Sequence, residues 1–409
     1  VNLREHRAGS RDAELRAREI HARAVTIDSH VDIPADYDTA EHDPGSETSI
    51  LRCDLVKMKK GGLKGVFLAV FTPQEPRLDP EGYQDAYREA MLGFERIRRL
   101  TEKMYPGLCE LAASPADVLR IAATGKRVVM IGLENGYPVG EDLARIGKFH
   151  EGGARYVTLC HTAHNQICDS SGPGKPLHNG LSDFGRRAVA EMNRIGMMID
   201  VSHISEKSFW DVLALTRAPV IASHSGCAAL HAHDRNLTDA QLKALAGNRG
   251  VIQIVALASY LKPKTAARRK AEEALEMEVP FTWLSPRETR NLTEKELADY
   301  SARRKVHRQR MAEINAKHPV ASLADFVNHI DYAVKVAGID HVGIGTDFDG
   351  GGGIPGYSNE SEALNVTLEL VRRGYSDEAI EKIWGRNLLR VWREAQQAAG
   401  GADAISSAP

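Results

Sequence analysis

The sequence predicts an α/β fold, a closed (β/α)8 or TIM barrel, and three observations carry this prediction. Eight short apolar runs rich in Val and Ile recur along the 409 residues, which is typical of parallel strands buried on both faces. Segments with helical, amphipathic patterns separate these runs. Side chains of metal-binding type follow several of the runs, and the carboxyl ends of barrel strands all open onto one face.

The predicted strands follow one another with intervals long enough for a helix. They are Val25–Val31, Gly65–Phe71, Val128–Leu133, Tyr156–Cys160, Met197–Val201, Pro219–Ser223, Val251–Leu257 and His341–Thr346. A doubly wound open sheet is the alternative. It explains less, because an open sheet gathers its ligands at one crevice, whereas the candidate ligands follow strands one, three, five, six and eight.

Two of the intervening segments carry signals for both ends of a helix. One begins at Ser182 and stops at Gly196, and the other begins at Ser322 and stops at Gly338. Serine caps the first backbone N–H groups of a helix, and glycine readily adopts the left-handed conformation that ends one. Helices are therefore expected between these residues.

One stretch, Lys262–Lys317, does not fit the alternation of strands and helices. It is rich in Arg, Lys and Glu and contains no buried-strand run. We interpret it as a charged, solvated helical insertion before the last strand; interleaved acidic residues oppose the other interpretation, a basic recognition patch. Residues 1–409 are expected to form a single domain that includes this insertion.

Composition narrows the class of protein. A hydrophobic content of 43%, a charged content of 26% and a net charge of −2 are ordinary for a globular protein and argue against a nucleic-acid partner. No apolar stretch approaches the ~18–20 residues of a membrane span. The chain begins with Val rather than Met, so we expect any signal peptide to be gone already. Among compartments, a periplasmic or secreted location is favoured over the cytoplasm.

Five cysteines are an odd and sparse set, and none forms a Cys-x-x-Cys pair. We expect them to be buried or free thiols rather than zinc ligands or redox partners. They are Cys53, Cys109, Cys160, Cys168 and Cys227.

The end of the first strand carries the motif His30-x-Asp32. Alternate residues of a strand point to the same face, so both side chains can reach one metal ion; a simple His–Asp hydrogen bond is the alternative. Glu134 ends the third strand. It is either a solvent-facing loop residue or the carboxylate that bridges two ions and screens their repulsion, and we favour the bridge.

His203 and His224 follow the fifth and sixth strands, which are neighbours in a barrel. Neutral imidazoles are good zinc ligands, and adjacency would place both on one ion rather than in separate structural hydrogen bonds. Asp347 closes the eighth strand, where it could bind metal or take a proton from a metal-bound water. Asp349 is the competing choice, and we assign it a turn-stabilising role instead.

Other chemical motifs have little support. Residues 349–353 are Asp followed by four glycines but lack the Lys-Ser/Thr of a phosphate loop, so we interpret them as a mobile loop at the site. The glycines at 61–65 precede a strand, which is the wrong order for a dinucleotide fingerprint. No Gly-x-Ser-x-Gly is present, and a serine nucleophile is therefore not indicated.

Taken together, these positions resemble the membrane (renal) dipeptidase family, the M19 metallopeptidases of the amidohydrolase superfamily. The resemblance spans about Val25 to Trp392. It rests on a series of motifs in the same order: IDSHVDIP (27–34), DLVKMKKGG (54–62), IGLENG (131–136), RYVTLCHTAHN (155–165), DVSHIS (200–205), APVIASHS (218–225), HDRN (233–236), HVGIGTDFDG (341–350) and NLLRVW (387–392).

The resemblance implies a role for each matching residue. His30 and Asp32 would bind one zinc, Glu134 would bridge both, and His203 and His224 would bind the second. Three further positions would contact the substrate, namely His161 at the scissile bond and Arg235 and Tyr260 at the terminal carboxylate. Asp347 would be the acid/base residue. The sequence departs from mammalian members at Thr162–Asn165 and in a longer 262–317 segment.

The function expected on this basis is hydrolysis of dipeptides by a hydroxide that bridges two Zn²⁺ ions per chain. Substrates would be L-Xaa-L-Xaa dipeptides, with a D-residue tolerated at the C-terminal side. The alternatives are another amidohydrolase, such as an N-acyl amino acid deacylase, and a catalytically silent metal-binding protein on the same scaffold. A homodimer is the assembly considered.

Overall fold

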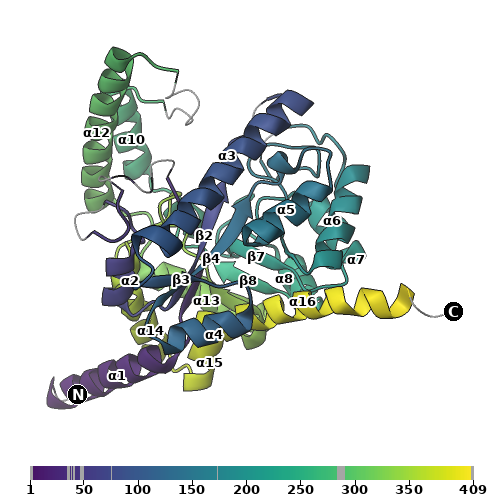
Figure 1. Cartoon of the computed structure of the whole chain (residues 1–409). Coiled ribbons are helices and arrows are strands. Elements are labelled where there is room, and N and C mark those ends of the chain that lie inside the picture. The colour runs from purple at the N-terminus through teal and green to yellow at the C-terminus, as the bar shows by residue number, and fades with distance from the viewer. Residues whose placement is uncertain are drawn as a thin grey trace.

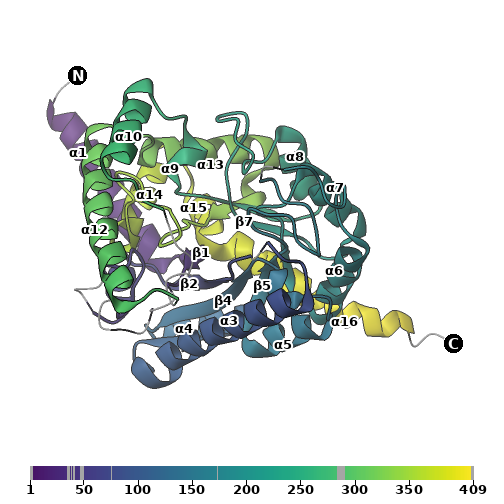
Figure 2. The same cartoon turned by 90° about the horizontal axis from the view of Figure 1, so that it is seen from above.

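The computed structural model describes residues 3–406 apart from 35–36, 38, 40–41, 47–49, 75, 173 and 283–290. Within these residues eight parallel strands form the predicted barrel, with helices around it (Figures 1 and 2). In sheet order they are β1 (Ile27–Asp32), β2 (Gly65–Phe71), β4 (Arg127–Glu134), β5 (Ala154–Thr158), β6 (Met198–Asp200), β7 (Ile221–Ser225), β8 (Val251–Ile254) and β9 (Val342–Ile344). Every predicted run overlaps one of them, and β1, β4, β5 and β7 extend one or two residues beyond the predicted bounds.

A further short strand, β3 (Cys109–Leu111), was not predicted. It pairs with the first residues of β4 on the side of the barrel and lies outside the ring of eight. Two of its three residues are only half-buried, so it lacks the continuous apolar run that indicates the barrel strands.

The barrel closes between its first and last strands. The backbone N–H of Asp347 donates to His30 O at 2.9 Å, and the N–H of Asp32 donates to Phe348 O at 2.9 Å. Phe348 and Val31 form an isolated parallel bridge there. The chain just after β9 therefore completes the hydrogen-bonded ring at the height of His30 and Asp32.

The helices follow the expected alternation. They are α1 (Leu3–Arg23), α2 (Leu55–Gly61), α3 (Pro80–Arg99), α4 (Pro115–Ala123), α5 (Ala144–Gly152), α6 (Asp183–Ile195), α7 (Glu206–Leu215), α8 (Asp239–Gly247), α9 (Ala258–Leu261), α10 (Ala266–Glu278), α12 (Glu294–Lys317), α13 (Leu323–Ala337), α14 (Ala363–Arg372), α15 (Asp377–Glu381) and α16 (Asn387–Ser406). Short 3-10 or π turns lie at Leu100–Met104, Tyr137–Val139, Ile339–His341, Glu360–Glu362 and Lys382–Arg386.

The two helices with predicted end signals are α6 and α13. The Ser182 side chain accepts from the N–H of Gly185 at the start of α6, and Gly196 ends it in a left-handed conformation with φ of 74°. Ser322 caps α13, and Gly338 follows it. Both predictions are confirmed.

The barrel interior is closed from below by the C-terminal helix. Trp392 of α16 is fully buried against Phe67 of β2, and apolar residues of β1, β4, β5, β6, β7 and β8 belong to the same cluster. A second, larger cluster lies between the strands and the outer helices. Burial of this apolar surface supplies the main favourable term of folding and leaves the opposite, carboxyl-terminal end of the barrel free for polar side chains.

Two long helices, α10 and α12, occupy most of the 262–317 segment. They lie side by side and rise away from α1 and α16 in Figure 1, and Arg310 pairs with Glu278 between them at 2.7 Å. No residue of α12 is buried. Arg268 of α10 also connects to the end of α12, donating to His318 O at 2.9 Å and to Asn315 Oδ1 at 2.7 Å.

All five cysteines are buried and free, as expected. None of the helices in the described part of the chain combines the length and the apolar character needed to cross a bilayer.

Candidate metal centre

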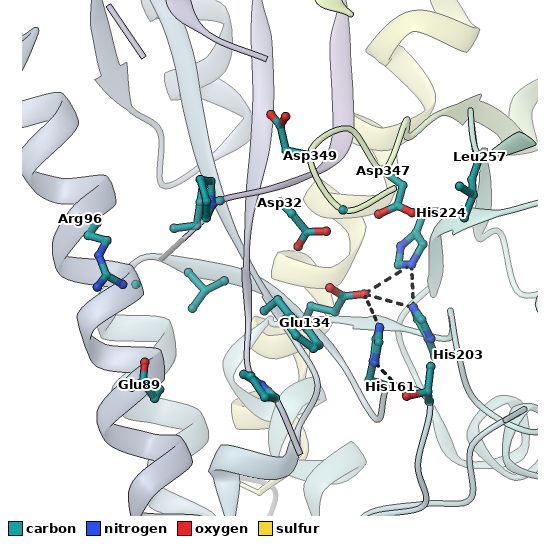
Figure 3. Close-up of a pocket in the computed structure, with 18 of the residues that line it drawn as sticks. Asp32, Glu89, Arg96, Glu134, His161, His203, His224, Leu257, Asp347 and Asp349 are labelled. Atoms are coloured by element: carbon teal, nitrogen blue, oxygen red, sulfur yellow. Dashed lines mark hydrogen bonds and ion pairs between the residues drawn. The ribbon is translucent and has the colours of Figure 1, made fainter. Parts of the chain in front are cut away.

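The register of the strands places the candidate ligands at one height. Phe71 of β2 lies opposite Glu134 of β4, Glu134 opposite Thr158 of β5, and Thr158 opposite Asp200 of β6. Each strand thus ends at the same level, and the residues just beyond these ends face a common space. Figure 3 shows side chains from these separate strand ends converging there.

Glu134 is at the centre of this convergence. One carboxylate oxygen, Oε1, lies 3.1 Å from His203 Nε2, 3.5 Å from His224 Nε2 and 3.8 Å from His161 Nε2. The other oxygen, Oε2, lies 3.5 Å from His30 Nε2. A single carboxylate therefore turns one oxygen toward the first strand and the other toward β5, β6 and β7, the arrangement a bridge between two ions requires.

Three overlapping groups of side chains could each hold a metal ion. They are His30–Glu134–His224, Glu134–His161–His203 and His30–Asp32–Asp347, and the donor atoms within each group lie within 4.8 Å of one another. His203 Nε2 and His224 Nε2 are only 2.8 Å apart. The structure thus brings together all five predicted ligands and Asp347.

A second observation, which does not depend on the residue types, also favours metal binding by these donor atoms. Asp32 Oδ1 is buried and has no hydrogen-bond partner within the described chain, and His30 Nε2, also buried, has only the Glu134 carboxylate at 3.5 Å. Leaving a buried polar atom unpaired costs free energy, and a metal ion would remove that cost. Three imidazoles among the donors favour zinc over magnesium or calcium, which prefer oxygen.

The protonation states of His203 and His224 suit these residues for ligation. Burial lowers the pKa of His203 and of His224 well below the ordinary value, so both are neutral at pH 7. Burial also lowers the pKa of His30, but Glu134 and neighbouring carboxylates outweigh it and raise that pKa to about 10. Burial opposes ionisation of Glu134, yet His30 and His203 hold its pKa well below normal.

Side chains deeper in the barrel orient two of the imidazoles. His30 Nδ1 hydrogen-bonds the Tyr156 hydroxyl at 2.9 Å, and that hydroxyl donates to Ser29 O at 3.2 Å. His224 Nδ1 hydrogen-bonds Ser223 Oγ at 2.8 Å, and Ser223 Oγ donates to Asp200 Oδ2 at 2.6 Å. In both cases Nδ1 is engaged, which leaves Nε2 directed at the centre.

These orienting residues were not predicted from the sequence, although a signal exists. Asp200 lies inside an apolar run and is fully buried, as is Asp28 in the first strand. Asp28 Oδ1 accepts from His30 N at 3.0 Å and Thr346 N at 2.9 Å, and Asp200 Oδ1 accepts from the N–H groups of residues 202 and 223. A carboxylate within an otherwise apolar strand could have indicated such a role.

Backbone geometry is unusual in two turns at the site. His203 has φ of 70° and Asp347 has φ of 60°, values that non-glycine residues rarely adopt. Beside them, Gly350 has no room for a side chain: a Cβ there would collide with Asp32 Oδ2 and lie 2.5 Å from Asp347 Oδ1. The glycine therefore lets the turn after β9 approach both carboxylates.

Asp347 and Asp349 face different surroundings. Burial raises the pKa of Asp347 to about 7, with His30 opposing and Glu134 adding to the rise. Asp349 accepts instead from the backbone N–H groups of Arg52 at 2.8 Å and Cys53 at 3.2 Å, and burial raises its pKa to about 6. Asp349 therefore connects the turn to the segment before α2, whereas Asp347 faces the donors.

The predicted substrate contacts surround the same centre. His161 lies between Phe71 and His203, with ring centroids 4.7 and 4.2 Å away. Arg235 is buried, donates through Nη2 to His224 O at 3.1 Å, and lies 5.4 Å from the Tyr260 ring centroid. Its Nε is buried and has no hydrogen-bond partner in the described chain, and Arg235 lines a neighbouring cavity that shares His203 with the one over the centre.

A cavity of about 410 Å³ opens over the centre. Its lining includes Glu134, His161, His203, His224, Asp347 and Tyr260, and it extends across Phe71 to α3 (Figure 3). Two charged residues of that helix, Glu89 and Arg96, line it as well and were not predicted. They belong to an amphipathic helix, where charged residues ordinarily face solvent, so nothing in the sequence distinguished them.

The sequence was compared with known families and structures. The family described as "Membrane dipeptidase (Peptidase family M19)" matches residues 14–406. The chain belongs to the M19 family. Dipeptidase tcpJ of Claviceps purpurea (strain 20.1) is 32% identical over 355 residues, which cover 85% of this chain and 70% of that protein.

Solved structures agree with this M19 assignment. The probable dipeptidase PvdM from Pseudomonas aeruginosa is 34% identical, with a TM-score of 0.81 over 95% of this chain and all of that one. A metallo peptidase from Rhodobacter sphaeroides, solved with a phosphinate mimic of the dipeptide L-Ala-D-Ala, shares the fold at 22% identity and a TM-score of 0.67, covering 91% and 99% of the two chains. The chain is thus an M19 metallopeptidase of the dipeptidase type.

Proposed function

We propose that this M19 dipeptidase holds two zinc ions and cleaves dipeptides that have a free C-terminal carboxylate. The observation that carries the proposal is the position of Glu134, whose two oxygens face donor atoms on opposite sides. His30 and Asp32 would hold one ion, and His203 and His224 the other. When bound, the ions would polarise the peptide carbonyl and lower the pKa of a water toward about 7.

Arg235 positions the substrate in this proposal. Its guanidinium is fixed by the bond to His224 O and by the Tyr260 ring, while Nε remains unpaired in the described chain. A guanidinium can bind a carboxylate through two parallel hydrogen bonds. Selection for a short substrate with a free terminus follows, because a longer chain has no carboxylate at this distance from the scissile bond.

His161 and Asp347 act on the reacting atoms. Burial lowers the pKa of His161, so its imidazole is neutral and can donate a hydrogen bond to the carbonyl oxygen as negative charge develops there. The carboxylate of Asp347 accepts a proton from the attacking water and returns it to the leaving amine. Tolerance of a D-residue at the C-terminal side is part of the proposal, and the ligand of the Rhodobacter relative supports it.

The test is a panel of substrates with zinc-loaded protein. It comprises L,L- and L,D-dipeptides, their C-terminal amides and N-acyl amino acids. Dipeptides should be hydrolysed and their amides should not. Preferential hydrolysis of N-acyl amino acids would support a deacylase instead.

Substitution of Arg235 tests the carboxylate contact directly. Arg235→Met should lower kcat/KM for dipeptides by ~30–1,000-fold, the equivalent of ~2–4 kcal/mol, without loss of zinc. Equal turnover of amidated dipeptides by the unmodified enzyme would contradict the assignment.

A further inference from the structure

Arg96 of α3 differs from the neighbouring arginines of its helix. In the described chain Arg88 pairs with Asp85, and Arg98 donates to Gly152 O at 3.0 Å. No hydrogen bond or ion pair within the same residues engages the Arg96 guanidinium, which lines the cavity over the metal centre. An unpaired cation in the wall of a binding cavity is available to an anionic group of a ligand.

Arg96 and Arg235 lie on opposite sides of the barrel. The sheet order places β2 and β7 four strands apart in a ring of eight. α3 follows β2, and Arg235 follows β7. Figure 3 accordingly shows Arg96 and Glu89 across the cavity from His203 and His224, with Glu134 between them.

This placement gives a bound dipeptide a direction. If its C-terminal carboxylate is on Arg235 and its peptide carbonyl is beside Glu134 and His161, its amino-terminal residue extends toward β2 and α3. The cavity wall on that side is apolar along Val70, Phe71 and Pro73 before it reaches Arg96. A side chain with methylene groups and a terminal carboxylate would match this wall, because the methylene groups would contact the apolar residues and the carboxylate would reach Arg96.

We propose that Arg96 selects dipeptides whose amino-terminal residue carries an acidic side chain. This inference rests on the proposed function, because it takes the orientation of the substrate from the carboxylate contact at Arg235. Arg96 forms a charge-assisted hydrogen bond with the side-chain carboxylate and acts as a specificity determinant, not as a catalytic residue.

Glu89 lines the same cavity and carries the opposite charge. It lies seven residues before Arg96, or about 10 Å along the helix axis at ~1.5 Å per residue. Glu89 already has a hydrogen bond or electrostatic contact with another residue, so its charge is at least partly satisfied. A preference for basic amino-terminal residues would indicate that Glu89, rather than Arg96, dominates this wall.

The experiment compares kcat/KM for Glu-Ala, Asp-Ala, Gln-Ala, Lys-Ala and Ala-Ala in the zinc-loaded enzyme and three variants. The enzyme should prefer Glu-Ala over the isosteric Gln-Ala by about tenfold, the size expected of one partly exposed charge-assisted contact. Arg96→Gln should remove this preference by lowering kcat/KM for Glu-Ala to about the value for Gln-Ala. Arg96→Glu should favour Lys-Ala.

Arg88→Gln is the matched control. It makes the same change on an exposed face of the same helix, away from the cavity, and should keep the preference for Glu-Ala. Equal turnover of Glu-Ala and Gln-Ala by the unmodified enzyme, or an equal loss on both in Arg96→Gln, would overturn this inference and leave the dipeptidase proposal intact. Hydrolysis of none of the dipeptides, Ala-Ala included, would instead contradict the proposed function and this inference with it.

Discussion

Asp347 and Asp349 belong to one turn but have different partners. Asp347 lies with His30 and Asp32 in a group that could bind metal, and Asp349 accepts two backbone N–H groups from residues 52 and 53. Both carboxylates line the cavity, but only Asp347 belongs to one of the groups of donor atoms, whereas Asp349 is engaged by backbone N–H groups. This difference in partners predicts which of the two aspartates is needed for catalysis, and substitution of each one tests the prediction.

We therefore predict that Asp347→Asn lowers kcat for dipeptides by ~10²–10⁴-fold, because an amide cannot accept the proton that a carboxylate accepts. Asp349→Asn should be much milder, since the amide oxygen still accepts one backbone N–H. Both should be measured at saturating zinc. If Asp349→Asn is the crippling change, the assignment of Asp347 is wrong.

Gly350 is required by the close approach of its turn to the donors. Gly350→Ala should push apart Asp32 and Asp347 and weaken metal binding by at least about tenfold, the loss typical when support of a ligand is disturbed. Gly147→Ala on α5 is the control, because a Cβ there meets nothing within 4 Å. Competition with a chromogenic chelator measures the metal affinity of both variants, and equal affinities would refute this role of Gly350.

At the scale of elements, one buried histidine connects three helices. His21 of α1 has Nδ1 2.7 Å from Thr367 Oγ1 of α14 and Nε2 2.8 Å from Gly61 O of α2. Trp384 Nε1 also donates to Thr367 Oγ1 at 2.8 Å, so the threonine hydroxyl is free to donate to His21. This network suits a neutral imidazole with its proton on Nε2.

Burial lowers the pKa of His21 to about 4 from an ordinary value of 6.5. Between these values the unfolded chain binds the proton and the folded chain does not, so folding stability falls as the pH decreases from 6.5 toward 4. The loss attributable to this residue is roughly 3 kcal/mol.

Chemical denaturation of the wild type and of His21→Gln across this pH range should show this loss of stability. The wild type should lose more stability than the variant, although His150, whose pKa burial also lowers to about 4, leaves a slope in both. Parallel pH profiles would contradict the assignment to His21. His318→Gln, at a histidine that is not fully buried, is the control.

The elements also show why some features could be predicted and others could not. The barrel strands are continuous apolar runs and could therefore be predicted. The polar residues at the carboxyl ends of these runs include His30, Glu134, His203 and His224, and the barrel fold predicts that such residues lie close together. β3 was not predicted because a half-exposed strand of three residues has no such apolar pattern. Arg96 could not be predicted because its proposed role depends on its position in the cavity wall. The periodicity of a helix indicates only which side of the helix is apolar.

For the molecule as a whole, metal binding and folding are linked. The donors come from β1, β4, β6, β7 and the turn after β9, so an unfolded chain cannot assemble them. Two bound zinc ions per chain should raise the free energy of unfolding, by about 2.7 kcal/mol for each site at 100 times its Kd.

Chelation should therefore lower the Tm and abolish activity, and zinc should restore both. Elemental analysis alongside a zinc titration of activity counts the ions. Full activity at one ion per chain, or an unchanged Tm after complete removal of metal, would exclude a binuclear centre of this kind.

The seam of the barrel also bears on how the protein is made. Asp28 and Thr346, which hydrogen-bond across that seam, are 318 residues apart in the chain. At ~5–20 residues per second, translation leaves β1 without its closing partner for roughly 15–60 s. During that time the edge of the first strand is open, and His30 and Asp32 lack the backbone bonds that hold them in place. The His30–Asp32 side of the proposed centre can therefore form only after β9 has been made, and a chain released before β9 keeps an exposed strand edge on which aggregation can begin.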